Sequence, residues 1–375
     1  MRKLNPARLL LPLALLYALA SAASAQTPVD ARGALSTFPD SQAVLFVDAH
    51  RVVNDVLPRV MPAADYRKML EEAKKVGFDV RGLQFAVVGV RFNGDAPAGT
   101  PPEFVLVVKG NFNADSMLAL GKIMLAAQNV QGRVETYGGK SIEIIDTDAV
   151  ARSMGKGVGA AGADGEGSKP KSMPYPEVAV AALDSSTLVA GVPAFVHSAI
   201  DAAGGQGRLR PELLALAAQD PNAIWSLTAE LPPNLVEMAH GYGMPPNAQF
   251  DQMIGWVKQL NISQGMTALD FTLGVALTTD QPEHASAFSG LIRMGQAAAE
   301  NMLREAASKS KGKDAAKARD ALAVLSTAVN RTEGNTLFLR VSVPQKTVLN
   351  IINEERLKGA TKPKPRTTRR RLRRR

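Results

Sequence analysis

The sequence predicts an α+β protein made of two similar half-domains, each a β-α-α-β-β-α-β-β-α unit with mainly antiparallel sheets and helices packed on one face. Three observations support this expectation. Short apolar runs alternate with segments of helical periodicity through most of the chain. Glycine- or aspartate-containing turns join pairs of strands into hairpins. Four sequence landmarks occur in the same order in both halves, as an internal duplication would leave them.

The first half-domain is expected to span residues 36–205. Its predicted strands are apolar runs at residues 43–48, 83–90, 104–108, 134–137, 141–145, 178–183 and 187–190. Its predicted helices cover residues 63–76, residues 115–128, which an Asn or Asp cap candidate precedes, and a segment opened by Pro193. The inward faces of the first and last of these helices are Tyr66, Met69, Leu70 and Ala73, and Phe195, Val196, Ala199, Ile200 and Ala203.

Two turns and one insertion punctuate this half. Gly138-Gly139 and Asp184-Ser185-Ser186 each separate two short strands, which indicates two hairpins. Residues 151–176 are rich in Gly, Ala, Ser, Lys and Pro and lack an apolar period. We therefore expect a long flexible insertion between two strands rather than a domain boundary.

The second half-domain is expected over residues 220–356 and repeats the same order. Its predicted strands are residues 223–229, 266–273, 274–278 and 336–341. Its predicted helices are residues 247–259, a long helix that begins after Asp280 and is interrupted at 308–313, its continuation over 314–329, and a last helix opened by Pro344.

The four landmarks lie at turns and at the junctions between elements. They are the Asp-x-x-Ala sequences at Asp40 and Asp220, the glycines Gly82 and Gly265 before a strand, the hairpin turns 136–140 and 332–336, and the Val-Pro pairs at Val192 and Val343. Together they favour a duplication. The alternative is that the turns and caps common to all α+β sequences produce the same coincidences.

Two segments carry a resemblance to known proteins. One is Phe38-Pro39-Asp40-Ser41-Gln42-Ala43, which leads into an apolar strand that ends in Val47-Asp48; the other is the run LDSSTLVAGVPAFVHSAID at residues 183–201. In these segments the chain resembles a broad set of exported bacterial proteins of unknown function. The resemblance extends over most of residues 36–352 and implies a secreted α+β body without implying an activity.

Residues 1–25 have the pattern of a cleavable signal peptide. Arg2, Lys3 and Arg8 precede an apolar core at residues 9–20, and Ala23-Ser24-Ala25 supplies the small residues of a cleavage site. We expect the mature chain to begin at Gln26, in the periplasm or outside the cell. An uncleaved anchor is the alternative, but the apolar core is shorter than the roughly 20 residues that a membrane span needs. The chain has no cysteine, which excludes disulfides and thiol chemistry.

The net charge of +9 comes from the C-terminus. Residues 357–375 are expected to form a disordered tail because they are rich in charge and nearly free of apolar side chains. Without the tail and the leader the rest of the chain is mildly acidic. Ten tail residues could bind an anionic polymer or membrane surface: Lys358, Lys362, Lys364, Arg366, Arg369, Arg370, Arg371, Arg373, Arg374 and Arg375. Sequence-specific nucleic-acid binding is not expected, since no aromatic side chain is present to stack on bases. The alternative is a solvated tail that binds nothing specific.

Three patterns come close to known site motifs and fail. Gly157-x-Gly159-x-x-Gly162 matches a dinucleotide fingerprint but lies in the predicted insertion, without a strand-turn-helix frame. Gly139-Lys140-Ser141 ends like a phosphate loop, yet Val134 stands where the first glycine belongs. Asp146-Thr147-Asp148 could bind a cation, but the calcium-loop pattern would need an acid or amide at Val150.

The histidines and tryptophans give weak signals. The four histidines, none at a zinc-binding spacing, are His50, His197, His240 and His284. Asp48 and His50 would share a face if the first strand continued, as a base and its orienting carboxylate or simply as a surface pair. Trp225 and Trp256 are expected in the core of the second half, with ligand stacking as the alternative.

These observations favour an exported, non-enzymatic envelope protein with a binding or scaffolding role, without metal or cofactor. Two alternatives stay open: a hydrolase whose site is assembled from distant residues, and a binder of anionic polymer or membrane through the tail. A pocket that gathers His, Asp and Ser side chains would favour the hydrolase.

Truncation after Leu357 tests the tail. The full chain is expected to sediment with anionic vesicles at low salt and to lose this binding as salt rises, because surface attraction is screened within about 8 Å at physiological ionic strength. The truncated chain should not sediment but should melt at the same temperature, since the tail buries nothing. Equal sedimentation of both chains would place the binding on the body and contradict the prediction.

Overall fold

The computed structural model describes residues 31–75, 77–92, 100–158, 174–241, 245–350 and 352. The expected signal peptide, the ten basic tail residues, Gly159 and Gly162 therefore lie outside the described residues. No helix of the described residues is long and apolar enough to cross a membrane.

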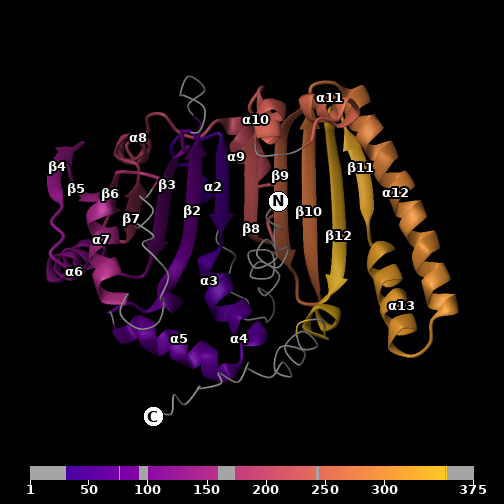
Figure 1. The fold of residues 1–375 in the computed structure, drawn as a ribbon, viewed down its shortest axis with the longest axis horizontal. Coiled ribbons are helices and arrows are strands. Elements are labelled where there is room, and N and C mark those ends of the chain that lie inside the picture. Colours follow the sequence, from indigo (N-terminus) through magenta and orange to yellow (C-terminus); the bar gives the residue numbers. More distant parts are fainter. Residues whose placement is uncertain are drawn as a thin grey trace, which may run out of the picture.

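The strands of both halves form one antiparallel sheet, drawn face-on in Figure 1. From one edge to the other they are β11 (Val329–Glu333), β12 (Thr336–Pro344), β10 (Asp270–Thr279), β9 (Val257–Met266), β8 (Ala223–Glu230), β1 (Ala43–Val47), β2 (Leu83–Arg91), β3 (Glu103–Gly110), β7 (Thr187–Gly191), β6 (Glu177–Asp184), β5 (Lys140–Asp146) and β4 (Arg133–Tyr137). The expected α+β class with antiparallel strands is confirmed. The two predicted half-domains share this single sheet.

The helices connect the strands in a similar order in both halves. In the first half they are α2 (Ala31–Leu35), α3 (Ala49–Arg51), the π-helix η1 (Val52–Val56), α4 (Leu57–Val60), α5 (Ala63–Lys75), the 3₁₀ turn η2 (Val80–Gly82), α6 (Ala114–Ala127), α7 (Thr147–Val158) and α8 (Pro193–Ala203). Then follow α9 (Pro211–Ala217), α10 (Leu235–Gly241), α11 (Ala248–Trp256), α12 (Pro282–Lys309) and α13 (Lys313–Leu325), and residues 345–350 are also helical.

The two halves meet where β1 pairs with β8. Phe46 lies opposite Ser226 in this ladder, and the two residues are as far apart in the chain as the landmarks Asp40 and Asp220. A local two-fold axis through this pair would therefore superpose the two landmarks. Outward from the centre, both halves continue with their second and third strands, and the last strand of each half, β7 or β12, returns beside the third.

One of the four predicted landmark pairs, Gly82 and Gly265, does not occupy equivalent positions in the two halves. Gly82 precedes β2, as expected, but Gly265 lies near the end of β9 instead of before a strand. The predicted strands 266–273 and 274–278 are likewise wrong, because β10 runs unbroken from Asp270. The sequence of β9, VKQLNISQGM, contains no run of apolar residues, which is the signal that marked the other strands. The turn before β10 lacks glycine and proline, and is closed by a backbone hydrogen bond from Thr267 N to Asp270 O at 2.9 Å.

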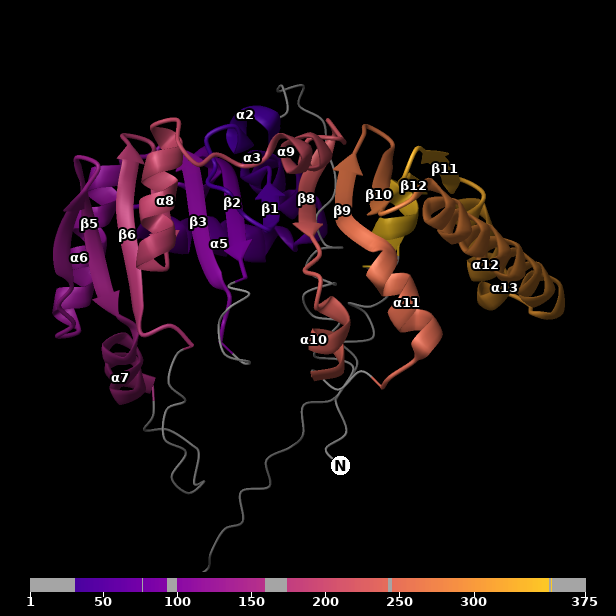
Figure 2. The ribbon, with the colours of Figure 1, turned by 90° about the horizontal axis from the view of Figure 1, so that it is seen from above.

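Helices cover both faces of the sheet, where we had expected one face. Along β1, Val44 and Phe46 point into one core with α2, α8 and α9, whereas Leu45 and Val47 point into the other, with α4. Figure 2 shows α8 and α9 on one side of the sheet and α10 and α11 on the other. The alternation of apolar side chains along the central strand thus serves two cores at once.

Several local predictions are confirmed. In α5 the four residues of the predicted face are half-buried while most of the others are exposed. The Asn113 side chain accepts from Ser116 N at 2.7 Å and caps α6. Gly138 and Gly139, with φ of 53° and 73°, form the turn between β4 and β5. In α8 the buried residue near the end is Ala202 rather than Ala203.

The start of the predicted insertion is wrong. Residues 151–158 belong to α7, which begins directly after β5. The Asp146 carboxylate accepts from Ala149 N at 3.0 Å, so it satisfies one of the free N–H groups at the beginning of that helix. Residues 159–173 lie outside the described residues.

A pair of phenylalanine substitutions tests the role of the shared strand. Phe46 is 1% exposed, so Phe46→Ala should lower the free energy of unfolding by about 3–5 kcal/mol. Phe250→Ala, at a ring that is 44% exposed, should change it by less than about 1 kcal/mol. Urea unfolding followed by circular dichroism gives both values. Two separate transitions in the wild-type protein would contradict the coupling of the halves through β1.

Candidate functional site

The candidate site lies at one end of the central strand pair, next to the point where the two halves meet. Gln42 precedes β1 and Glu230 ends β8. The two residues are tied through the backbone, since Glu230 N donates to Gln42 O at 2.7 Å and Gln42 N donates to Val90 O at 2.9 Å. Both residues line two adjoining cavities. We call the one next to α10 and α11 the apolar cavity, after the aliphatic side chains of those helices, and the other the polar cavity, after its charged side chains.

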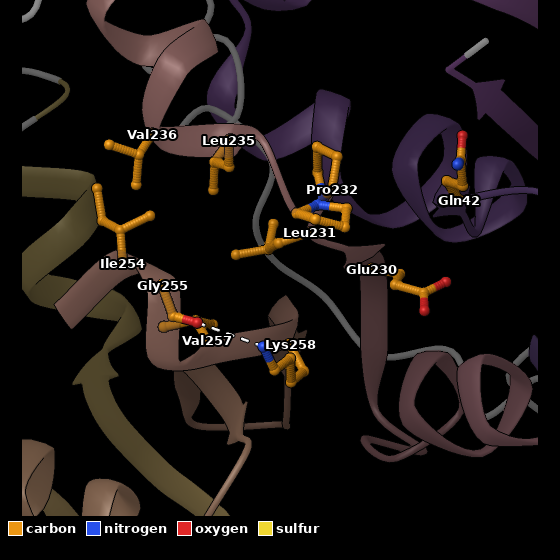
Figure 3. Close-up of a pocket in the computed structure, with 11 residues that line it drawn as sticks. Gln42, Glu230, Leu231, Pro232, Leu235, Val236, Ile254, Gly255, Val257 and Lys258 are labelled. Carbon is orange, nitrogen blue, oxygen red and sulfur yellow. Dashed lines mark hydrogen bonds between the residues drawn. The ribbon is translucent and has the colours of Figure 1, made fainter. Parts of the chain in front are cut away.

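The apolar cavity has a volume of about 350 Å³ and is shown in Figure 3. It opens between the end of β8, α10, α11 and the start of β9. Its lining residues are Gln42, Glu230, Leu231, Pro232, Pro233, Leu235, Val236, Ile254, Gly255, Val257 and Lys258. In Figure 3, Leu235, Val236 and Ile254 converge from the two helices onto the same space. The side of the cavity formed by the two helices is therefore aliphatic, whereas Gln42, Glu230 and Lys258 lie elsewhere in the lining, so that polar and apolar groups contribute about equally to its surface.

Local sequence explains why the two helices frame this space. Pro232 and Pro233 follow β8 and lack the N–H groups that would continue its ladder. The Asn247 side chain accepts from Phe250 N at 3.2 Å and caps α11. His240 Nε2 lies 3.1 Å from Asp251 Oδ1 and links α10 to α11. The walls are thus held by caps and by one side-chain pair between the helices.

The two charged residues that line the apolar cavity, Glu230 and Lys258, differ in whether they form an ion pair. Glu230 forms an ion pair with Arg210, whose Nε also lies 3.3 Å from Asp40 Oδ1. The hydrogen bond to Glu230 raises the pKa of Arg210 above its ordinary value. Lys258 Nζ donates to the Gly255 carbonyl at 3.3 Å, and no described carboxylate lies within ion-pair distance of it. Lys258 is therefore the cation of the lining that forms no ion pair among the described residues, and its charge acts at longer range on Asp280.

The polar cavity, of about 340 Å³, lies on the other side of Gln42 and Glu230. Its lining residues are Asp40, Ser41, Gln42, Arg91, Phe92, Arg210 and Glu230. Arg91 is held by an ion pair of 2.6 Å with Glu103 and lies 4.4 Å above the ring of Phe195. Each charged lining residue has an ion-pair partner: Arg91 pairs with Glu103, and Arg210 pairs with Asp40 and Glu230. This cavity thus offers polar surface without a free charge.

A packed cluster supports the wall of the apolar cavity from behind. Trp256, between Gly255 and Val257 of the lining, stacks on His284 with ring centroids 4.0 Å apart. His284 Nδ1 lies 2.6 Å from Asp280 Oδ1, and Asp280 N donates to Trp256 O at 2.9 Å. The hydrogen bond from His284 holds the pKa of Asp280 below its ordinary value. Trp256 is half-buried, and its ring packs against the side chain of His284.

The structure corrects the proposed Asp48–His50 pair. The strand ends at Val47, so the two residues do not share a strand face. Asp48 is fully buried and its side chain accepts from Arg51 N at 3.0 Å, which caps α3. The carboxylate therefore has a structural role at the end of β1.

The other candidates also prove structural. Asp146 caps α7, and the described residues hold no group of three or more acidic or histidine side chains that could bind a metal ion. His197 stacks on Tyr137 and lies 2.9 Å from Glu135 Oε1. Trp225 lies in the core, as predicted, and its Nε1 donates to Gln264 Oε1 at 2.8 Å.

Sequence reasoning missed the cavity residues. Glu230 and Lys258 belong to no motif. Gln42 lies in the segment 38–43 without a predicted role, and no pattern in the sequence brings the three together. The one available signal was Pro232-Pro233 directly after an apolar strand, which marks an abrupt end to the ladder.

His284→Phe tests the supporting cluster, because it keeps a ring over Trp256 while it removes the donor to Asp280. The pKa of Asp280 is below its ordinary 3.8 in the folded state, so this hydrogen bond stabilises the fold above that pH and is lost as pH falls through the folded pKa. The variant should unfold at lower urea than the wild type at pH 7, and the difference should narrow below pH 3.8. A difference that persists unchanged at pH 2.5 would instead assign the effect to packing.

Comparisons with known proteins yield a structural similarity only. No protein-family model matches the chain, and no curated protein matches it. Solved structures of TP0453 are similar over most of both chains. Crystal form III has 8% sequence identity and a TM-score of 0.39, and the match covers 85% of this chain and 97% of that chain. Crystal form IV has 9% identity and a TM-score of 0.40, and the match covers 85% of this chain and 95% of that chain. Similarity at this level assigns no site and no activity to this chain.

Proposed function

We propose that this chain is an exported, non-enzymatic binding protein that holds a small ligand in the apolar cavity between α10 and α11. The observation that carries the proposal is the convergence of aliphatic side chains from two helices and the end of β8 on one space, next to a cavity with paired charges. Ligand sites in proteins are typically apolar clefts with a few polar groups that orient the ligand.

The charge pattern at the site suits binding better than catalysis. General acid–base chemistry needs a titratable group that can exchange a proton with the substrate. Asp40, Arg210 and Glu230 are instead engaged with one another. No observation at this cavity favours the alternative of a hydrolase assembled from distant residues. The other alternative, binding of an anionic surface through the tail, is tested by the truncation after Leu357.

Binding of the neutral apolar dye Nile red tests the proposal. The purified protein should bind the dye with a fluorescence increase, and Leu235→Gln should weaken binding about tenfold, because a polar amide replaces an aliphatic wall group. Leu269→Gln serves as the matched control: Leu269 is 77% exposed in the turn between β9 and β10. Both variants should melt close to the wild type.

Two outcomes would contradict the proposal. One is the absence of saturable dye binding to the wild-type protein. The other is an equal loss of binding in both variants, which would place the dye on exposed apolar surface outside the cavity.

A further inference from the structure

We propose that the ligand of the apolar cavity is an anionic amphiphile with a single aliphatic chain, whose acidic head group pairs with Lys258. This inference rests on the proposed function, since it names the class of molecule that the same cavity binds. It depends on three features of the cavity: the chemistry of its walls, its size and the state of its charged groups.

The walls favour an aliphatic chain. The side chains that enclose the space are Leu231, Leu235, Val236, Ile254 and Val257, together with two prolines. Among the described residues no aromatic ring lines the cavity, so these walls offer a flat ring system no stacking partner. Flexible methylene groups match such a surface through dispersion contacts and removal from water.

The size favours one chain. The volume of about 350 Å³ lies at the lower end of the range for small-molecule sites, roughly 300–1,000 Å³. A chain of medium length with a compact head group fits this volume. A two-chain phospholipid exceeds it.

The charges favour an acidic head group. Glu230 is paired with Arg210, which it shares with Asp40, so its charge is partly compensated within the protein. Lys258 is exposed at the rim, and the one partner found for its ammonium group is the Gly255 carbonyl, shown by the dashed line in Figure 3. An ammonium group has three donors, so a bound anion can be accepted without breaking an internal ion pair. The flexible lysine stem lets the charge follow the head group.

Displacement of Nile red by probes of equal chain length tests the inference. Decanoate should displace the dye from the wild-type protein at about tenfold lower concentration than decan-1-ol, because a charge-assisted hydrogen bond replaces a neutral one. Decyltrimethylammonium should be the weakest. Decyl phosphate in the same assay distinguishes a phosphate head group from a carboxylate, and preference for either over decan-1-ol supports the proposal.

Variants of the lysine locate the head group. Lys258→Gln should remove the preference for decanoate over decan-1-ol, whereas Lys258→Arg should retain the preference. Lys68→Gln, at an exposed position on α5, is the matched control and should behave as the wild type. The full chain is used throughout, so the basic tail contributes equally in every variant.

The outcomes separate the two proposals. Equal displacement by decanoate and decan-1-ol in the wild type, or an undiminished preference in Lys258→Gln, would overturn the assignment of the head group while dye binding still supports the cavity. Failure of all four probes to displace a bound dye would overturn the ligand class. Absence of dye binding would overturn the proposed function itself.

Discussion

The backbone pairing of β1 with β8 is the contact on which the rest of the structure depends. It joins the strands of the two halves into one sheet, because β1 is bonded to β2 on one side and to β8 on the other. The alternation of side chains along β1 places Phe46 in one core and Leu45 in the other. Loss of this ladder would therefore remove the strand pairing that joins the two halves and disturb both cores.

The candidate site is a consequence of how that ladder ends. The backbone bond between Gln42 and Glu230 is among the last links between the two strands, and the prolines that follow stop the ladder there. The chain then turns into α10 and α11, whose aliphatic side chains enclose the apolar cavity. The same strand end presents Glu230 to Arg210, which also pairs with Asp40, and the exposed Lys258 is the cation in the lining of the cavity. Shape and charge at the site thus have one structural origin.

Sequence patterns succeeded where the deciding interactions are local. The cap at Asn113, the two-glycine turn before Lys140 and the inward face of α5 depend on residues within a few positions of one another. They failed at β9 and β10, where Gly265 and Gly274 looked like breaks. Both glycines lie within strands, and a side chain at Gly265 would come within 2.5 Å of Thr272 Oγ1. A close cross-strand approach, invisible in the sequence, explains the glycine there.

The sequence by itself determined that the chain alternates strands and helices, that most strands come as antiparallel neighbours, and where many caps and turns lie, because periodicity and turn chemistry act over short distances. Only the tertiary structure decided that the halves share one sheet, that helices cover both faces, and that Asp48 caps a helix instead of orienting His50. It alone brought Gln42, Glu230 and Lys258 to one cavity. Strand partners far apart in the chain are selected by the packing of the whole core, and no local pattern encodes that selection.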